Sequence, residues 1–246
     1  MSNSQTAKAV SLQQLRQNCA NCSLHDLCLP AGINDQDLDN LDRVVAERRR
    51  VDRGQFLYLP GQPYTSLFVV RFGSFKSVAS LPDGEEQIIG FHLTGELLGL
   101  DSLGPGKHQA AAQALETSSV CEVPYDQLER VAHAVPGLQR QLLNMVSREL
   151  NQEQNHLVLI TRKSARARLA TFILGYARRL EARGHRTDEF TLSLSRYDLA
   201  NYLGLAVETV SRLFTSFRDE GMLRVERRRI GILDRDALKR ESDHCD

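Results

Sequence analysis

Cysteine is the residue type in this chain whose spacing most clearly points to chemistry. Cys19, Cys22 and Cys28 follow one another as C-x2-C-x5-C, Cys121 stands alone in the middle of the chain, and Cys245 lies in the polar C-terminal tail. The first ten residues lack the apolar centre of a secretory signal, so we expect a cytoplasmic protein whose thiols stay reduced. The cluster therefore indicates metal binding rather than disulfides, and Cys245 is expected to be a thiol without a role.

Two alternatives to a site made of four cysteines have to be weighed. With His25, the residues Cys19, Cys22, His25 and Cys28 have a constant spacing of three, which suits a compact Cys3His zinc site that does not need Cys121. An enzyme with a nucleophilic cysteine would need an activating His–Asp arrangement, and none is visible near any cysteine. We therefore favour thiolates that hold a metal and do not expect an enzyme.

A second group of residues has the types and spacing needed to read DNA. Glu208, Ser211 and Arg212 are spaced i, i+3 and i+4, so a helix would present all three on one face. Arg is the best bidentate reader of guanine, Glu can accept a hydrogen bond from cytosine N4, and Ser is adaptable. A plain amphipathic helix with a surface Glu–Arg pair is the simpler interpretation. The elements around the segment favour DNA reading.

The charge distribution supports a DNA-binding C-terminal part. The net charge is zero, but residues 162–240 carry 18 Lys and Arg against 10 Asp and Glu, whereas residues 1–161 carry 13 against 18. A basic third on an acidic body is typical of a module that binds a polyanion. The length of 246 residues allows one large or two medium domains, and no run approaches the ~18 apolar residues of a membrane span.

The elements that must position these residues indicate an α+β protein in four parts. Alternating apolar residues at 55–59, 66–70, 73–78 and 87–91, separated by turn signals and ending near 120–123, predict an antiparallel roll. The expected parts are a cysteine-rich arm at 1–30, a β-roll sensor domain at 31–135 that opens with a short helix near 33, a dimerisation helix at 136–162, and a winged helix-turn-helix at 163–246.

The C-terminal part has the capping and turn residues that are typical of a winged helix-turn-helix. Ser195 is a candidate N-cap for a helix at 196–203, Gly204 makes a turn, and a second helix at 207–220 ends at Gly221. Two short strands at 223–226 and 230–233 would form the hairpin behind the helices.

The helix at 136–162 carries a stripe that predicts a two-fold seam. Apolar residues spaced three and four apart form the stripe, and Glu153 fills the slot between two of them. Two Glu153 carboxylates about 4 Å apart would repel by ~1–4 kcal/mol, which makes the dimer marginal and easy to switch. The simpler alternative is a Glu153 that bends out to solvent. The predicted interface consists of Leu143, Val146, Leu150, Glu153, Leu157 and Ile160.

The β-roll, the long helix and the sequence VETVSR at 207–212 together resemble the CRP/FNR superfamily of dimeric bacterial transcription regulators. The C-x2-C-x5-C motif with a distant cysteine resembles the FNR/ANR-type anaerobic, oxygen-sensing branch. This resemblance implies that Cys19, Cys22, Cys28 and Cys121 hold an oxygen-labile [4Fe-4S] cluster. It also implies that oxygen converts the cluster to [2Fe-2S], that the dimer then dissociates, and that DNA is released.

The same resemblance implies the partners. The dimer would bind inverted repeats with TTGAT-type half-sites and switch on anaerobic genes. Arg212 would contact guanine, Glu208, Thr209 and Ser211 would lie at neighbouring bases, and Arg228 in the wing would contact phosphate. An acidic hairpin tip at 81–86 would touch RNA polymerase, although an ordinary solvated turn explains it as well.

The roll itself resembles a cyclic-nucleotide-binding domain, with Gly95 and Glu96 opening its landmark segment. The position of the Arg that pairs the cyclic phosphate is occupied by His108, and a neutral His cannot replace that fixed bidentate charge. We therefore expect no binding of cyclic AMP, although Lys107 could substitute for the missing charge. The alternative function is a ligand-gated regulator of the CRP type with a structural Cys3His zinc arm.

Overall fold

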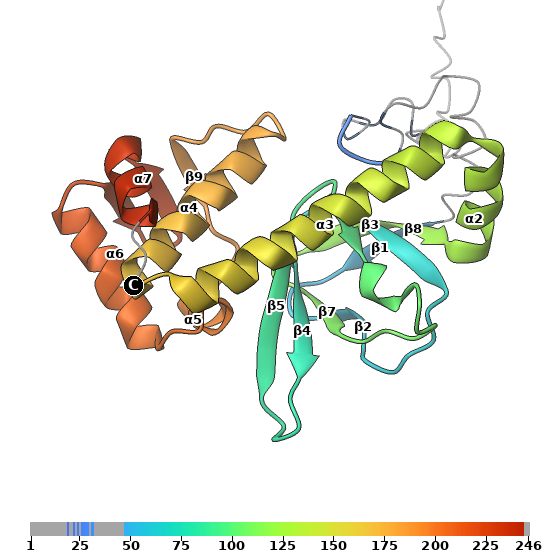
Figure 1. The fold of residues 1–246 in the computed structure, drawn as a ribbon, viewed down its shortest axis with the longest axis horizontal. Helices are drawn as coiled ribbons and strands as arrows, with labels where there is room; N and C mark the ends of the chain where they lie inside the picture. Colours follow the sequence, from blue (N-terminus) through green and yellow to red (C-terminus); the bar gives the residue numbers. More distant parts are fainter. Residues whose placement is uncertain are drawn as a thin grey trace, which may run out of the picture.

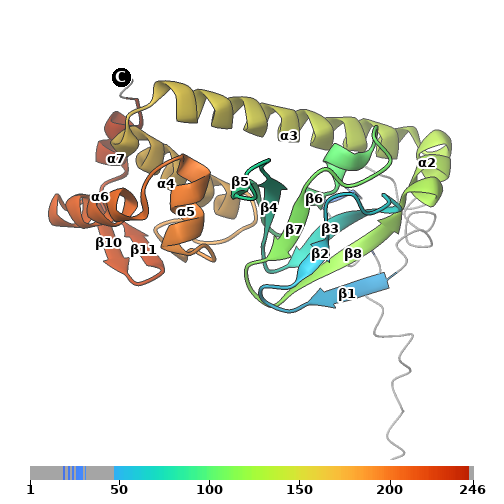
Figure 2. The same ribbon diagram turned by 90° about the horizontal axis from the view of Figure 1, so that it is seen from below.

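The computed structural model describes residues 19, 22, 24, 26–29, 31 and 47–243. The short helix expected near 33, His25 and Cys245 lie outside the described residues. A β-roll and a C-terminal helical part lie at the two ends of one long helix, α3 (Pro136–Arg162), which spans both (Figures 1 and 2). None of the described helices is both long and apolar enough to cross a membrane.

Two four-stranded antiparallel sheets form the roll. Phe75, Val70 and Val120 are fully buried between them. The predicted strands are confirmed, while β1, β6 and β7 were not predicted because they are short or polar. The first sheet has the order β1 (Glu47–Val51), β8 (Ser118–Pro124), β3 (Ser66–Phe72), β6 (Leu97–Leu98), and the second β2 (Phe56–Tyr58), β7 (Ala111–Ala114), β4 (Phe75–Ser80), β5 (Glu86–His92).

The first sheet is covered by helices and by the described part of the arm. A buried cluster joins β3 and β8 to α2 (Tyr125–Ala134), to the first half of α3 and to Leu29 of the arm. In Figure 1 the short blue arm segment lies beside that half of α3. The arm and the long helix therefore pack against the same face of the roll.

The C-terminal part is a winged helix-turn-helix, as predicted. The Ser195 side chain accepts a hydrogen bond from the Asp198 amide, and the Asp198 carboxylate accepts one from the Ser195 amide. Together they form a capping box. Gly204 ends the first helix in the left-handed conformation with φ of 62°, where a side chain would add strain. Its elements are α4 (Ala165–Glu181), β9 (Glu189–Thr191), α5 (Arg196–Leu203), α6 (Val207–Asp219), β10 (Leu223–Glu226), β11 (Arg229–Ile232) and α7 (Arg235–Asp243).

The largest hydrophobic core crosses the boundary between the roll and the winged helix. Val78, Ile88 and Phe91 of the β4–β5 hairpin belong to the same buried cluster as Ile173 of α4 and Leu199 of α5. A 3-10 turn, η2 (Leu100–Ser102), follows β6, and its Leu100 packs against the cluster that also contains residues of α2 and α3. Continuous apolar packing thus fixes how the two parts sit relative to each other.

Candidate functional site

Cys121 is held by the centre of a sheet. It lies in β8, opposite Val69 of β3 and Arg48 of β1, so both neighbouring strands fix its backbone. Its half-buried side chain packs against the cluster below α2 and α3. The sequence predicts that the last strand ends near 120–123, but β8 continues to Pro124, so Cys121 lies within the strand and not at its end.

The arm brings Cys28 to the same cluster. Cys28 packs against the apolar residues that contact Cys121, and its amide donates to the Leu24 carbonyl at 2.9 Å in a tight turn. Gln141 of α3 is buried, and its Nε2 donates to the Cys28 carbonyl at 3.0 Å. The sequence does not single out Gln141, because its one signal is a polar residue at a helical position that only the fold buries.

The thiols sit in an apolar surrounding. Part of Cys28 is exposed, but desolvation of its thiol raises the pKa to about 12, and the charges of Cys121 and Cys22 add to this rise. Burial likewise raises the pKa of Cys121, with Cys22 again contributing. Cys19 lies one turn before Cys22, whose amide donates to its carbonyl at 3.3 Å. Both buried thiols are therefore protonated in the metal-free protein, and a metal would have to displace their protons.

The residues fit a thiolate-bound centre in their chemistry. Among the residues that the structure describes, no three Cys, His, Asp or Glu side chains lie close enough together to hold a metal ion. Soft sulfur donors nevertheless gather from the arm and from β8 at one apolar surface, which suits iron–sulfur or zinc ligation. Cys28 and Cys121 are the donors that share the buried cluster.

The predicted DNA-reading residues lie on one accessible side of α6. Glu208, Ser211 and Arg212 are exposed and Thr209 is half-buried. Ser211 Oγ donates to the Val207 carbonyl at 2.9 Å, and Arg212 Nη2 donates to Thr209 Oγ1 at 3.4 Å. The opposite face is anchored by Val210, Phe214 and Phe217, all buried. The helix therefore presents its polar side chains outward from a firm core.

The wing and α5 add basic groups beside this helix. Arg228 is half-buried and its Nη1 donates to the Ser193 carbonyl at 3.3 Å, while Arg227 at the tip is exposed with φ of 56°. Arg196 was not predicted as a functional residue. Its guanidinium carbon lies 3.4 Å from the centroid of the Phe214 ring, and the side chain donates to the Arg227 carbonyl. Burial lowers the pKa of Arg196 to about 10, so it remains charged at neutral pH. Arg196 thus ties the first helix to the second and to the wing.

Among the described residues, few contacts within the chain cover the predicted dimer stripe. Leu143, Val146, Leu150 and Leu157 are exposed, with Leu143 at 64% and Leu157 at 59% of their full accessibility. Glu153 is also exposed, and partial desolvation raises its pKa. Ile160 differs from the rest, because it is half-buried against the core of the winged helix.

His108 occupies the interior of the roll. It is buried and stacks on Tyr58 with ring centroids 3.7 Å apart, and its Nδ1 is 2.9 Å from Ser102 Oγ. Burial lowers the pKa of His108, so the ring is neutral. His108 is therefore an uncharged ring that is held inside the roll by Tyr58 and Ser102.

Comparisons with known proteins agree with this arrangement. Residues 48–134 match the cyclic nucleotide-binding domain and residues 167–241 match the Crp-like helix-turn-helix domain. The structure of FixK2 from Bradyrhizobium japonicum superposes with a TM-score of 0.75 at 32% identity, covering 81% of this chain and 98% of that one. A CooA variant from Carboxydothermus hydrogenoformans shares the fold, with a TM-score of 0.66 at 21% identity over 80% of this chain and 88% of that one.

Relatives of known name extend the likeness to nearly the whole chain. The transcriptional activator protein anr of Pseudomonas aeruginosa is 42% identical over 229 residues, which is 93% of this chain and 94% of that protein. The fumarate and nitrate reduction regulatory protein of Escherichia coli K12 is 41% identical over 227 residues, 92% of this chain and 91% of that protein. With a β-roll, a long helix and a winged helix-turn-helix matched throughout, the chain belongs to the CRP/FNR family of transcription regulators, in its FNR/Anr branch.

Proposed function

We propose that this protein is an oxygen-responsive transcription regulator that holds a [4Fe-4S] cluster on Cys19, Cys22, Cys28 and Cys121 and activates anaerobic genes. The observation that carries the proposal is the meeting of Cys28 and Cys121 at one buried cluster, with Gln141 of α3 bonded to the Cys28 carbonyl. When bound, such a cluster would supply a redox-sensitive link between the arm and the roll, which oxygen in air can break.

The chain's own residues would couple binding of the cluster to dimerisation. The arm packs on the first half of α3 through Leu29 and Cys28, and Gln141 anchors the loop to that helix. An ordered arm therefore supports the helix whose exposed face carries Leu143, Leu150 and Leu157. Because the described part of the chain covers little of that face, a second copy of α3 is its natural partner.

DNA recognition would follow from the dimer. Two copies of α6 about one DNA turn apart read an inverted repeat, for which the resemblance to the family suggests TTGAT-type half-sites. Arg212 contacts guanine, Glu208, Thr209 and Ser211 contact neighbouring positions, and Arg228 with its exposed neighbour Arg227 contacts phosphate. RNA polymerase is the proposed partner of the exposed β4–β5 tip at 81–86, and the cytoplasm is the proposed compartment.

The roll is not proposed to bind cyclic AMP. His108 is neutral and stacked on Tyr58, and a neutral ring offers no fixed charge to a cyclic phosphate. Lys107 at the neighbouring position is exposed, and it is the residue that would have to supply the missing charge. Micromolar binding of cyclic AMP in calorimetry would contradict this part of the proposal.

Cys121→Ser tests the metal assignment. Prepared without air, the wild-type protein should contain iron and sulfide, dimerise and bind an inverted repeat, whereas the variant should contain little iron and remain monomeric. Iron content, visible absorption and sedimentation measure these outcomes, and wild-type protein exposed to air serves as the matched control. A colourless wild-type protein with one zinc per chain would instead support the Cys3His arm, as would normal operator binding by the variant.

Arg212→Ala tests base reading. Loss of one bidentate contact costs ~1–3 kcal/mol of discrimination against the wrong base, so we expect the variant to lose sequence preference at one position of each half-site. Arg228→Ala should instead weaken binding to all sequences equally and flatten the salt dependence. Arg218→Ala, at the exposed far end of α6 beside Asp219, is the matched control that should change neither.

A further inference from the structure

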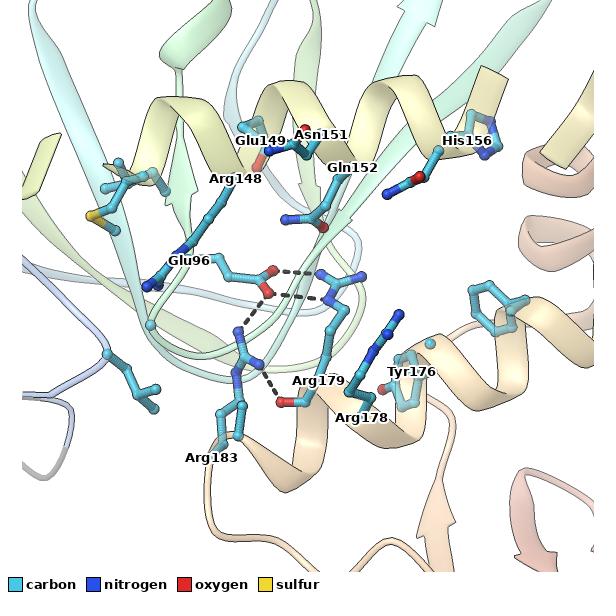
Figure 3. A pocket seen from close by; sticks show the side chains of 18 of the residues that line it. Glu96, Arg148, Glu149, Asn151, Gln152, His156, Tyr176, Arg178, Arg179 and Arg183 are labelled. Carbon is cyan, nitrogen blue, oxygen red and sulfur yellow. Dashed lines mark hydrogen bonds and ion pairs between the residues drawn. The ribbon is translucent and has the colours of Figure 1, made fainter. Parts of the chain in front are cut away.

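Glu96 lies at the centre of a buried ionic cluster that joins the roll to α4. Its Oε1 is 2.5 Å from Arg183 Nη2, and its Oε2 is 2.5 Å from Arg179 Nη2. Arg179 Nε donates to Oε1 at 3.1 Å as well. Figure 3 shows the two guanidinium groups converging on this one carboxylate. One acidic residue of the roll thus holds two basic residues of the winged helix part.

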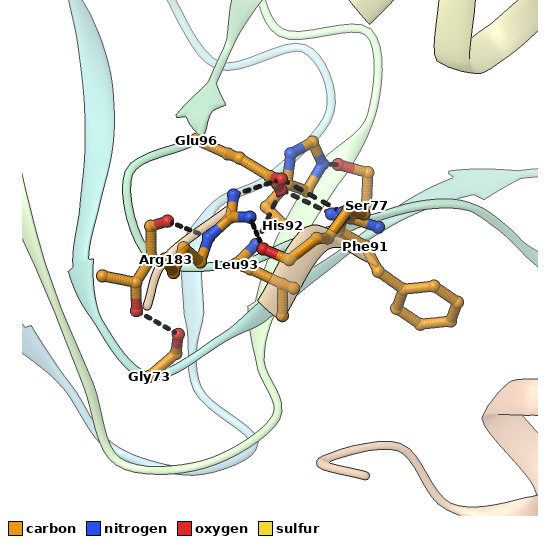
Figure 4. Close-up of polar contacts among 9 residues, drawn as sticks. Gly73, Ser77, Phe91, His92, Leu93, Glu96 and Arg183 are labelled. Atoms are coloured by element: carbon orange, nitrogen blue, oxygen red, sulfur yellow. Dashed lines mark hydrogen bonds and ion pairs between the residues drawn. The ribbon is translucent and has the colours of Figure 1, made fainter. Parts of the chain in front are cut away.

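The two arginines also grip the backbone of the roll. Arg179 donates to the Phe91 carbonyl, and Arg183 Nε donates to the Thr94 carbonyl at 2.5 Å. The Leu93 amide donates to Glu96 at 2.8 Å, which fixes the carboxylate within its own turn. Figure 4 shows these contacts around the turn that follows β5. Glu96, Arg179 and Arg183 are called the ionic joint below. Their hydrogen bonds to the backbone distinguish this joint from a solvated surface pair.

Burial makes the joint sensitive to the loss of any member. The side chains of Glu96 and Arg183 are 16% and 9% exposed, and the arginines hold the pKa of Glu96 below its usual value despite the burial. His92 Nε2 is 2.7 Å from the Ser77 hydroxyl, and burial lowers the pKa of His92 to about 4, so it carries no competing charge. An unpaired member would leave a buried charge uncompensated.

The cysteine arm touches this joint directly. Gly95 has φ of +85°, and a Cβ on it would lie 3.2 Å from Cβ of Leu27, the residue before Cys28. Leu27 and Glu96 also line the same cavity of about 490 Å³, between α3, α4 and the roll. A displacement of the arm at Leu27 therefore bears on the turn that carries Glu96.

We propose that Glu96 is a positioning residue that transmits the state of the cysteine arm to the DNA-binding part within a single protomer. The route runs from Leu27 to Gly95 by contact, and from Glu96 to Arg179 and Arg183 by charge. It rests on the proposed sensing role of the arm, but it acts through α4 and does not require the seam between two copies of α3. The winged helix thus responds to the arm before or without a change in oligomeric state.

The chain offers a matched control for this route. Lys76 and Asp198 form a second ion pair between the roll and the winged helix, 2.6 Å apart and similarly buried at 14% and 12% exposure. Asp198 belongs to α5, and within the described part of the chain its carboxylate accepts hydrogen bonds from Lys76 and Ser195 and not from the arm. Lys76→Gln therefore weakens the same interdomain contact at a place that the arm does not reach.

A double-mutant cycle read by amide hydrogen exchange in α4 tests the proposal. In the metal-free protein, Leu27→Ala should accelerate exchange around Arg179 and Arg183 at least about threefold, a change in the range of couplings between contacting residues. In the Glu96→Gln background, Leu27→Ala should have no further effect. In the Lys76→Gln background, the full effect of Leu27→Ala on exchange should remain. In a Glu96→Asp background, which keeps the carboxylate, Leu27→Ala should have at least half of its effect in the wild-type protein.

Equal responses to Leu27→Ala in the wild-type, Glu96→Gln and Lys76→Gln proteins would overturn the proposal, as would no response in the wild-type protein. The same exchange measured before and after air exposure, with iron content determined on each sample, separates the two proposals. Wild-type protein that contains no iron would refute the cluster, while the cycle in metal-free protein still decides the joint. Iron-loaded Glu96→Gln protein that keeps the wild-type response of α4 to air would refute the joint alone.

Discussion

The two faces of α3 differ in exposure, in polarity and in the residues that pack against them. One face leaves Leu143, Leu150 and Leu157 more than half exposed. The other buries Leu138, Met145 and Leu159, bonds the arm through Gln141, and turns Glu149 toward the cavity that holds the ionic joint (Figure 3). His156 on this second face stacks on Tyr202 of α5 with ring centroids 4.1 Å apart.

This contrast teaches that one helix can carry two different couplings. An exposed apolar stripe gains free energy only from another molecule, so its contribution depends on concentration. The packed polar face acts at all concentrations, because its partners belong to the same chain. Signals that reach α3 from the arm can therefore change both the pairing of protomers and the attachment of the winged helix.

Leu150→Asp should have the largest effect on the contrast. Each of two buried Leu side chains contributes ~1.5–3 kcal/mol to a two-fold seam, and the variant also brings two charges together, so the dimer dissociation constant should rise at least about 100-fold. Sedimentation of anaerobic protein measures it. Asn144→Asp, exposed on another side of the helix, should leave dimerisation unchanged. A dimer unaffected by Leu150→Asp would show that the apolar face is not the seam.

Glu153→Ala should have a smaller effect of opposite sign. Because Glu153 is exposed, repulsion between its two copies should lie near the low end, about 1 kcal/mol at 4 Å. The dimer should therefore become about fivefold tighter, and DNA binding should persist partly in air. Sedimentation and aerobic operator binding measure both changes. Identical aerobic binding by the variant and the wild-type protein would remove this charge from the switch, and Glu85→Ala at the hairpin tip is the control.

Glu149→Gln should have the smallest effect and should act on the other face. Burial raises the pKa of Glu149 to about 7, with the charges of Glu96, Glu153 and Asp101 adding to the rise and Arg179 opposing it. A carboxyl whose folded pKa is raised contributes stability that is full at low pH and is lost as pH rises through the folded value. The melting temperature should therefore fall between pH 5 and 8 in the wild-type protein and fall less in the variant.

Glu85→Gln, an exposed substitution in the hairpin tip, is the matched control for that measurement and should keep the wild-type pH dependence. Parallel pH profiles of the wild-type and Glu149→Gln proteins would mean that the cavity face does not sense protonation. The difference between the faces of α3 would then be one of polarity alone.

Local patterns in the sequence were sufficient for the elements and for the residues that act alone. Ser195 as a cap, Gly204 as a turn and the limits of α5 were predicted correctly, because capping and left-handed glycine depend on neighbours along the chain. The alternating strands of the roll and the stripe on α3 were predicted for the same reason, since period two and period 3.6 are local properties. The spacing of three cysteines likewise predicts a metal site from a local pattern, and that assignment stays a prediction.

Only the tertiary structure brought together residues that the chain keeps apart. Gln141 meets Cys28 across 113 positions and Arg183 meets Glu96 across 87, and neither contact has a local signal. The burial of Ile160, unlike the rest of its stripe, was also decided by the winged helix packed against it. Period and spacing specify which side of an element is apolar, but the partner that covers it depends on how distant elements pack.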